Sequence, residues 1–309
     1  MIIILIALGF IFLLFLGAGL FVVLYATTRR DRTELFKSST IAPSGRLIYK
    51  ESVEEGVKWF ENQKYESISI LSHDNLSLKA ILLRPSHPVA TVIALHGFRS
   101  WPSREFAGVA KLLYDNNIAV LYPYQRSHRI SEGHYITFGV KEKSDCAQWA
   151  FVMSDIFPDL PLFLYGQSMG GATVLMAGSV DLPVQVKGVI ADSAYNSPAA
   201  VIINLLKKSY HIPPFPLVYF VDFWTMLLGH YGLFRNGADK CMRPDLKYLF
   251  IHGDIDDLIP FSMGKSNFDA CPSLAKSFLT VKGAGHCACC YKNKTDYNNA
   301  LIQFIKNTI

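Results

Sequence analysis

Apolar side chains fill the N-terminal stretch 2–26, which contains no charged, Asn or Gln residue. Only Gly9, Gly17 and Gly19 within it lie outside the hydrophobic set. As a helix rising about 1.5 Å per residue, this stretch would reach roughly 37 Å, enough to cross a hydrocarbon layer of about 30 Å with some tilt. The pattern predicts one transmembrane helix, to which we assign residues 1–28. No second run approaches the required length, which argues against a multispanning protein.

A cleaved signal peptide is the alternative interpretation of this stretch. No basic segment follows Met1, and the apolar run is longer than the usual signal-peptide core of about 7–15 residues. We therefore expect a retained cell-membrane anchor. The residues after the span are enriched in basic side chains: Arg29, Arg30, Arg32 and Lys37, with Asp31 and Glu34 among them. The positive-inside rule then places the C-terminal part in the cytoplasm, with translocation of a soluble domain as the alternative.

Beyond residue 62, short apolar runs alternate with segments of helical periodicity. The strand-like runs are 66–71, 76–84, 91–95, 118–122, 162–165, 186–191, 248–251 and 277–281. The helical segments are 106–114, 145–154, 169–177 and 300–306. This alternation predicts an α/β domain over residues 63–309, with a mainly parallel sheet covered on both faces. Residues 29–62 are mixed and charged, and we interpret them as a juxtamembrane linker with a short helical pattern at 52–62.

One long segment, 192–247, interrupts the alternation. It includes an aromatic, proline-rich stretch at 211–228, where Asp222 and the prolines argue against a second membrane span. We interpret residues 195–243 as a lid-like insertion that lies over the carboxyl edge of the sheet and shapes an apolar substrate pocket. Ordinary core helices of the domain are the alternative.

Composition narrows the choice of partners and compartment. Half of the chain is hydrophobic and 18% is charged, which excludes a disordered protein. The net charge of +5, from 30 basic and 25 acidic residues, is too mild to indicate a nucleic-acid partner. Three of the six cysteines crowd into positions 287–290, which does not resemble the disulfide framework of a secreted domain.

The clearest chemical signal is Gly166-Gln167-Ser168-Met169-Gly170, which lies between a strand-like run and a helical run. This is the context of a nucleophile elbow, a strained strand-to-helix turn that presents a serine above the sheet edge. Glycines flank the serine because the tight turn brings backbones too close for Cβ atoms. We therefore predict Ser168 as the nucleophile.

A serine nucleophile needs a base, and the base needs an acid that orients it. In a chain with a nucleophile elbow the acid and then the histidine follow the serine. His286, after the last predicted strand, is the base candidate. Asp256 fits the acid position in 251–260, while Asp254 and Asp257 beside it and Asp192 on an earlier strand end remain alternatives.

An oxyanion hole requires two backbone N–H groups. We expect one from Met169, directly after the nucleophile, and one from Phe98, after the strand at 91–95, where Gly97 allows a close approach. The cluster at 286–290 holds a histidine and three cysteines, but nearly adjacent ligands do not fit a structural zinc site. We therefore expect no metal site. The roles of Cys287, Cys289 and Cys290 stay open.

From about Glu66 to Ile309 the chain resembles the α/β-hydrolase superfamily. The motifs that carry the resemblance are HGFRSWP (96–102), SEGHYITFG (131–139), GQSMGGATVLMA (166–177), VKGVIADS (186–193), IHGDIDDLIP (251–260) and GAGH (283–286). Within the superfamily it is similar to prokaryotic membrane-anchored hydrolases related to the serine aminopeptidase-like and monoacylglycerol lipase-like branches. The resemblance implies an eight-stranded, mainly parallel sheet, a Ser168–His286–Asp256 triad, and Phe98 and Met169 as oxyanion donors.

Two departures from the relatives affect the loop after the strand at 118–122 and the residues after the base. Tyr124 and Arg129 replace an aspartate and a glycine that relatives commonly carry, which alters the loop beside the pocket and leaves the triad intact. Cysteines follow His286 where relatives often have small or apolar residues.

The expected activity is cleavage of a small acyl or lipid-like carboxylic ester through an acyl-enzyme, without a metal or organic cofactor. This corresponds to a serine hydrolase of carboxylesterase or lipase type. A serine peptidase or amidase with the same triad is the first alternative, and a non-catalytic membrane scaffold is the second. The sequence leaves acyl length, physiological substrate and oligomeric state open.

Overall fold

The computed structural model describes residues 1–29 and 47–308, and three of the four basic residues after the predicted span lie outside these residues. Eight strands form one sheet: β1 (Glu66–Leu71), β2 (Ser77–Leu83), β3 (Ala90–Leu95), β4 (Ile118–Tyr124), β5 (Leu162–Gln167), β6 (Val186–Asp192), β7 (Lys247–Gly253) and β8 (Lys276–Val281). Their order is β1-β2-β4-β3-β5-β6-β7-β8. Strand β2 pairs antiparallel with β1 and β4, and the other neighbours are parallel. The predicted eight-stranded, mainly parallel sheet is confirmed.

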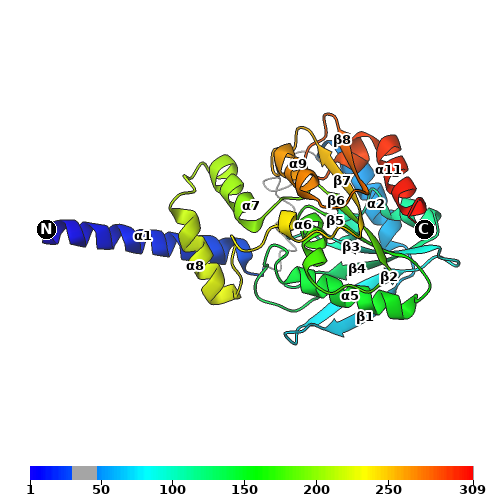
Figure 1. The fold of residues 1–309 in the computed structure, drawn as a ribbon, viewed down its shortest axis with the longest axis horizontal. Helices are drawn as coiled ribbons and strands as arrows, with labels where there is room; N and C mark the ends of the chain where they lie inside the picture. The colour runs from blue at the N-terminus through cyan, green and yellow to red at the C-terminus, as the bar shows by residue number, and fades with distance from the viewer. Residues whose placement is uncertain (30–46, 309) are drawn as a thin grey trace.

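Helices cover both faces of the sheet (Figure 1). Their bounds are α1 (Ile2–Thr27), α2 (Lys50–Glu61), α3 (Pro102–Glu105), α4 (Ala110–Asp115), α5 (Glu142–Ile156), α6 (Met169–Met176), α7 (Pro198–Asn204), α8 (Leu217–Gly229), α9 (Phe261–Ala270), α10 (Cys289–Lys292) and α11 (Lys294–Lys306). Short turns of other helix types lie at Leu47–Tyr49, Ala177–Ser179, Leu205–Ser209 and Ala238–Lys240.

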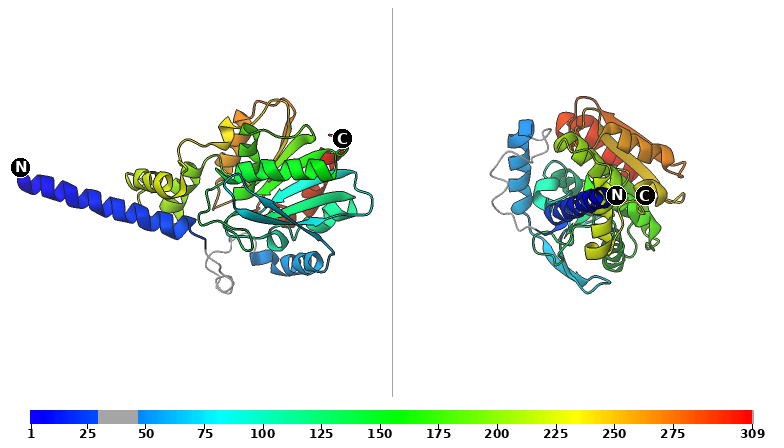
Figure 2. Two further views of the ribbon diagram at one scale, coloured as in Figure 1. Left: turned by 90° about the horizontal axis from the view of Figure 1, so that it is seen from below. Right: turned by 90° about the vertical axis from the view of Figure 1, so that its left-hand side faces the viewer.

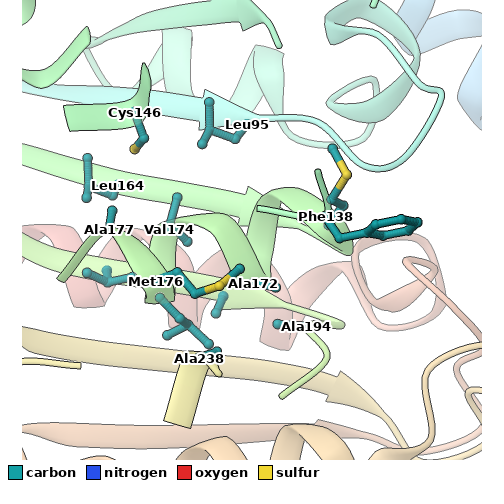
Figure 3. Packing of buried hydrophobic residues seen from close by; sticks show 14 of the residues in the cluster. Leu95, Phe138, Cys146, Leu164, Ala172, Val174, Met176, Ala177, Ala194 and Ala238 are labelled. Carbon is teal, nitrogen blue, oxygen red and sulfur yellow. The ribbon is translucent and has the colours of Figure 1, made fainter. Parts of the chain in front are cut away.

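Two hydrophobic cores result from this layering. On one face, α5 and α6 pack on the central strands, and Figure 3 shows Leu95 and Leu164 of the sheet near Val174 and Met176 of α6. On the other face, α2, α4 and α11 pack on the same strands. Strand β3 is buried along its whole length, as expected of a strand in the middle of a sheet covered on both faces.

Two expected boundaries differ from the structure. The helix expected at 106–114 begins only at Ala110, because residues 106–109 form a turn between α3 and α4. The turn between them passes close to α10, where a Cβ on Gly108 would lie 2.7 Å from the Cys290 sulfur. Within the segment interpreted as a linker, α2 packs on the domain, with Phe60 buried against Tyr122.

Helix α1 projects from the domain, and only its C-terminal half is accompanied by other elements (Figure 2). Its N-terminal half is exposed apolar surface, as in Ile3, Leu8 and Phe12. In length and composition it is the one helix of the described residues that could cross a membrane. The prediction of a single N-terminal apolar helix is confirmed.

Candidate active site

The serine predicted as nucleophile lies at a strained turn between β5 and α6. Ser168 has φ 56° and ψ −117°, a backbone conformation that non-glycine residues rarely adopt. A Cβ on Gly166 would lie 2.1 Å from the Gly170 carbonyl oxygen, and one on Gly170 would lie 1.9 Å from the Leu95 carbonyl oxygen. Both positions therefore require glycine, and the turn packs directly against the end of β3.

The three residues predicted as a triad form a chain of two hydrogen-bonding contacts, from Ser168 to His286 and from His286 to Asp256. Ser168 Oγ lies 2.9 Å from His286 Nε2, and His286 Nδ1 lies 2.8 Å from Asp256 Oδ2. The second Asp256 oxygen accepts the backbone N–H groups of Leu258 (3.1 Å) and Ile259 (2.8 Å). These bonds orient the carboxylate, so that His286 donates from Nδ1 and presents Nε2 to the serine hydroxyl.

Burial and charge set the protonation preferences of the buried pair. Burial alone would raise the pKa of Asp256, but the charge of His286 and hydrogen bonds from His252 and His286 hold that pKa below its usual range. Burial lowers the pKa of His286, whereas Asp256 and Cys287 raise it, and the pKa ends above its ordinary value. The pair thus favours an ionised Asp256, which stabilises a proton on His286.

The alternative acids are engaged elsewhere. Asp192, at the end of β6, accepts hydrogen bonds from Ser193, Tyr297 and Gln167 inside the sheet layer. Asp254 is exposed and accepts the Gly283 backbone N–H at 2.6 Å. Asp256 is the candidate whose carboxylate contacts His286, at 2.8 Å.

The loop that carries the predicted oxyanion donor passes beside the serine. A Cβ on Gly97 would lie 3.2 Å from the Ser168 Cβ, so Phe98 follows a point of direct contact with the elbow. Within residues 1–29 and 47–308, the backbone N–H groups of Phe98 and Met169 have no protein acceptor. His96 fixes the base of this loop, because its Nδ1 donates to Gly97 and its Nε2 accepts the Gln125 backbone N–H.

Two contacts of the site were missed in the sequence. His252 donates from Nε2 to the Ile259 carbonyl at 2.9 Å and lies 3.5 Å from Asp256. It therefore supports the acid loop, the segment 254–260 that carries Asp256. Arg99 donates to the carbonyls of Tyr25 (2.6 Å) and Ala26 (3.2 Å), which end α1. The position of His252 at a strand end hinted at the first, but no sequence signal joins Arg99 to residues that lie more than seventy positions earlier.

The loop that departs from the relatives is also fixed by packing. Arg129 adopts φ 51° and its guanidinium lies 4.4 Å from the centre of the Trp101 ring. Cys287, directly after the base, is buried, and its sulfur lies 3.4 Å from His286 Nε2.

Comparison with known proteins agrees with the fold. A family model described as serine aminopeptidase, S33, matches residues 86–213. The uncharacterized protein YqkD of Bacillus subtilis is 24% identical over 253 residues, covering 80% of this chain and 81% of the relative. The solved structure of the esterase Pf2001 of Pyrococcus furiosus has a TM-score of 0.65 at 21% identity, covering 80% of this chain and 92% of its own. The chain therefore has the α/β-hydrolase fold.

The chain is also similar to the uncharacterized membrane protein YNL320W of Saccharomyces cerevisiae. It is 25% identical over 228 residues, covering 72% of this chain and 73% of the relative. The family match over residues 86–213 and the similarity to a solved esterase support hydrolase activity in the general sense.

Proposed function

We propose that this α/β-hydrolase is a serine hydrolase that cleaves carboxylic esters, of acyl or lipid-like type, through a covalent acyl-enzyme. The observation that carries the proposal is the continuous hydrogen-bonded row from Ser168 through His286 to Asp256, with contacts of 2.9 and 2.8 Å. The serine lies on a strained turn in which Gly166 and Gly170 leave no room for a Cβ atom. A nucleophile, a base and an orienting acid in this order are what two-step acyl transfer requires.

In the first step, Ser168 Oγ attacks the ester carbonyl while its proton passes to His286 Nε2. Asp256 holds the tautomer and stabilises the imidazolium that forms. The backbone N–H groups of Phe98 and Met169 bind the oxyanion of the tetrahedral intermediate, a contribution of about 3–4 kcal/mol per donor in related chemistry. His286 then gives its proton to the departing alkoxide, which leaves as the alcohol, and the acyl group remains on Ser168.

In the second step, water replaces the alcohol. His286 accepts a proton from the water as it attacks the acyl carbonyl, and the same oxyanion donors bind the new intermediate. Collapse of the intermediate breaks the bond to Ser168, which recovers its proton from His286 as the carboxylic acid leaves.

The choice of an ester rests on the hydrophobic segment 195–243 and the apolar helix α1, and a serine peptidase or amidase is the second candidate. The matching family model is described as a serine aminopeptidase, which favours that alternative. A panel of p-nitrophenyl esters of graded acyl length, tested beside aminoacyl p-nitroanilides, separates the two. Faster turnover of the amides would replace the ester assignment.

A fluorophosphonate probe tests the serine mechanism itself. The wild-type chain should be labelled, and the label should be lost in Ser168→Ala. A wild-type chain that is not labelled, or a variant that is labelled equally, would contradict the serine mechanism and favour the non-catalytic membrane scaffold.

We also propose that α1 is a retained membrane anchor, because the apolar side chains of its N-terminal half are exposed. The name of the yeast relative, which calls that protein a membrane protein, points the same way. The catalytic domain then lies on the cytoplasmic side by the positive-inside rule. Alkaline carbonate extraction tests the anchor, since an anchored chain stays with the membrane pellet. Protease accessibility in sealed vesicles of known orientation tests the side.

A further inference from the structure

Helix α8 of the lid-like insertion is apolar on every side, although it lies on the surface of the molecule. One side is buried on the domain, a second contacts α1, and a third is largely exposed. The exposed side consists of Tyr219, Phe223, Met226 and Leu227, with exposed fractions between 38% and 58%, and the Tyr219 ring also contacts the rings of Phe215 and Phe234. These positions are spaced i, i+4, i+7 and i+8, so they form one continuous stripe on the helix. A helix that is hydrophobic all round belongs to a protein core or a membrane.

The Asp222 and Thr225 side chains of α8 are hydrogen-bonded within the molecule, and the Tyr219 hydroxyl is the polar group of the exposed stripe. The Asp222 carboxylate accepts the Leu233 backbone N–H at 2.6 Å, and the Thr225 hydroxyl donates to the Asp222 carbonyl at 2.9 Å. No charge therefore opposes an apolar environment on the exposed stripe.

The second side of α8 is locked to the middle of α1. The Phe220 ring lies 5.4 Å from Phe12 and 5.7 Å from Phe15, centroid to centroid. The Trp224 indole N–H donates to the Leu16 carbonyl at 2.8 Å. At Gly19 a Cβ would lie 2.8 Å from the Phe220 Cβ, so the crossing depends on a glycine in α1. Figures 1 and 2 show α8 crossing α1 outside the α/β body.

The length of α1 then fixes the depth of α8. A hydrocarbon layer of about 30 Å takes up about 20 residues of a helix, and α1 has 26. Whichever 20 consecutive residues of 2–27 occupy that layer, residues 8–21 are always among them. All contacts of α8 with Phe12, Phe15, Leu16 and Gly19 fall inside that range. Tilting α1 would place even more of it in the layer.

We propose that α8 is embedded in the bilayer as a second, non-spanning element, with the stripe Tyr219, Phe223, Met226 and Leu227 facing lipid acyl chains. The proposal rests on the proposed anchor. The preceding turn lies nearer the surface, because Tyr210 is hydrogen-bonded to Tyr25 at the domain end of α1. Exposed Lys207 and Lys208 and an aromatic ring at that level match the interface between lipid and water.

The embedded segment is joined to the candidate active site from two sides. Asn204, at the end of α7, donates to the Leu258 carbonyl in the acid loop at 2.9 Å. Arg99, next to the predicted oxyanion donor, bonds the last carbonyls of α1. The substrate class that this arrangement fits is an ester whose acyl chain is dissolved in the bilayer and reaches Ser168 without passing through water.

Fluorescence quenching tests the depth of α8 in the full-length chain. Of the six cysteines only Cys241 is not buried, so Cys241→Ser provides the background for single labels. Phe223→Cys and Leu227→Cys report on the stripe, Leu8→Cys on α1, and Val184→Cys, 81% exposed on the domain, is the aqueous control. Each is labelled with an environment-sensitive maleimide dye and reconstituted in phosphatidylcholine vesicles.

The expected result is that doxyl-labelled lipid quenches the dye at 223 and 227 as it does at 8, whereas iodide quenches only the dye at 184. Iodide quenching at 223 and 227 together with lipid quenching at 8 overturns the embedding and leaves the anchor intact. Iodide quenching at all four positions overturns the anchor and the embedding together.

Activity tests the substrate class independently. Phe223→Asp places a charge on the stripe and should lower hydrolysis of a long-chain acyl ester dissolved in vesicles by about tenfold or more. Hydrolysis of soluble p-nitrophenyl acetate and fluorophosphonate labelling should persist, and Val184→Asp should change neither activity. An equal rate on vesicle-borne ester for Phe223→Asp and wild type overturns delivery from the bilayer. A wild-type chain inactive on both esters instead contradicts the proposed function, while the quenching result still stands.

Discussion

Ser168 is held in its conformation by what surrounds it on three sides. Its backbone N–H donates to the Asp192 carbonyl at 2.9 Å, and the glycines on either side let β3 and α6 approach the turn. A residue at positive φ costs about 1–3 kcal/mol, which the packing of the elbow has to offset. The backbone strain is therefore located at the residue whose hydroxyl contacts His286.

The first prediction separates the acid from its neighbours. Asp256→Asn should lower kcat for a soluble ester by about ten-thousandfold, because an amide cannot hold the tautomer that leaves His286 Nε2 free. Asp254→Asn, two residues away and without contact to His286, is the matched control and should keep near-normal turnover. Steady-state kinetics with circular dichroism on both variants provides the measurement. A severe loss in Asp254→Asn or Asp192→Asn with an active Asp256→Asn would reassign the acid.

The second prediction concerns pH. The pKa of His286 is raised above its ordinary value, and only the neutral imidazole can accept the Ser168 proton. Activity should therefore be lost as pH falls through a pKa above about 6.5, and kcat/KM should still be rising there. A pH–rate profile with a soluble ester measures it. A rising limb at or below the ordinary histidine value would contradict the shift.

His96 gives a pH dependence of stability rather than of activity. Burial lowers its pKa to about 3, so the folded chain does not take up a proton there while the unfolded chain does below about 6.5. The free energy of unfolding should fall as pH drops from about 6.5 towards 3. Urea unfolding at several pH values measures this slope, and His96→Asn should flatten it. An unchanged slope in the variant would assign the acid sensitivity to other groups.

At the scale of elements, the elbow depends on how closely α6 meets β3. Gly170→Ala would place a Cβ 1.9 Å from the Leu95 carbonyl oxygen, so the strand end or the helix must move. We expect a loss of about 1–3 kcal/mol in unfolding free energy and weaker fluorophosphonate labelling. Gly232→Ala is the control, since its nearest neighbour would lie at an ordinary 3.5 Å. Equal stability and labelling of the two variants would show that the elbow tolerates the movement.

Arg99 provides a prediction about the contact between the end of α1 and the loop that carries Phe98. Arg99→Ala removes the bonds to the ends of α1 and should lower kcat more than it raises KM, by about tenfold or more, because the loop carrying Phe98 loses its support. The control is Arg104→Ala, whose guanidinium lies over the Trp101 ring instead. Matching kinetics in the two variants would show that the link has no role in positioning.

Contacts between residues in short motifs at strand ends could be predicted from the sequence, whereas contacts between distant segments could not. Ser168, His286 and Asp256 could be predicted because each lies in a short motif at a strand end, and parallel strands bring their carboxyl ends to one edge. The crossing of α1 and α8 could not, since it joins residues some two hundred positions apart, as in the bond from Trp224 to Leu16. The late start of the helix expected at 106–114 also involves a distant contact, because the turn at Gly108 lies close to Cys290 of α10.

At the scale of the whole molecule, exposed apolar side chains are concentrated on two helices that contact each other. Helix α1 contributes the first and α8 the second, and they cross each other (Figure 2). On both helices the outward-facing side chains, such as Leu8 and Leu227, are exposed. Helix α8 of residues 195–243, which the sequence analysis interpreted as a lid-like insertion, thus contributes an exposed apolar surface that we propose faces lipid.

The end of α1 is joined to the domain without slack. Thr28 pairs with Tyr135 as an isolated bridge, the Arg29 backbone N–H donates to the His134 carbonyl at 2.7 Å, and Ile136 donates back to Thr27. With α1 in a membrane, these bonds hold the serine at a constant height and tilt above the lipid. The search for a bilayer-borne substrate then becomes diffusion in two dimensions, so the encounter rate depends on surface density of the ester rather than on its concentration in solution.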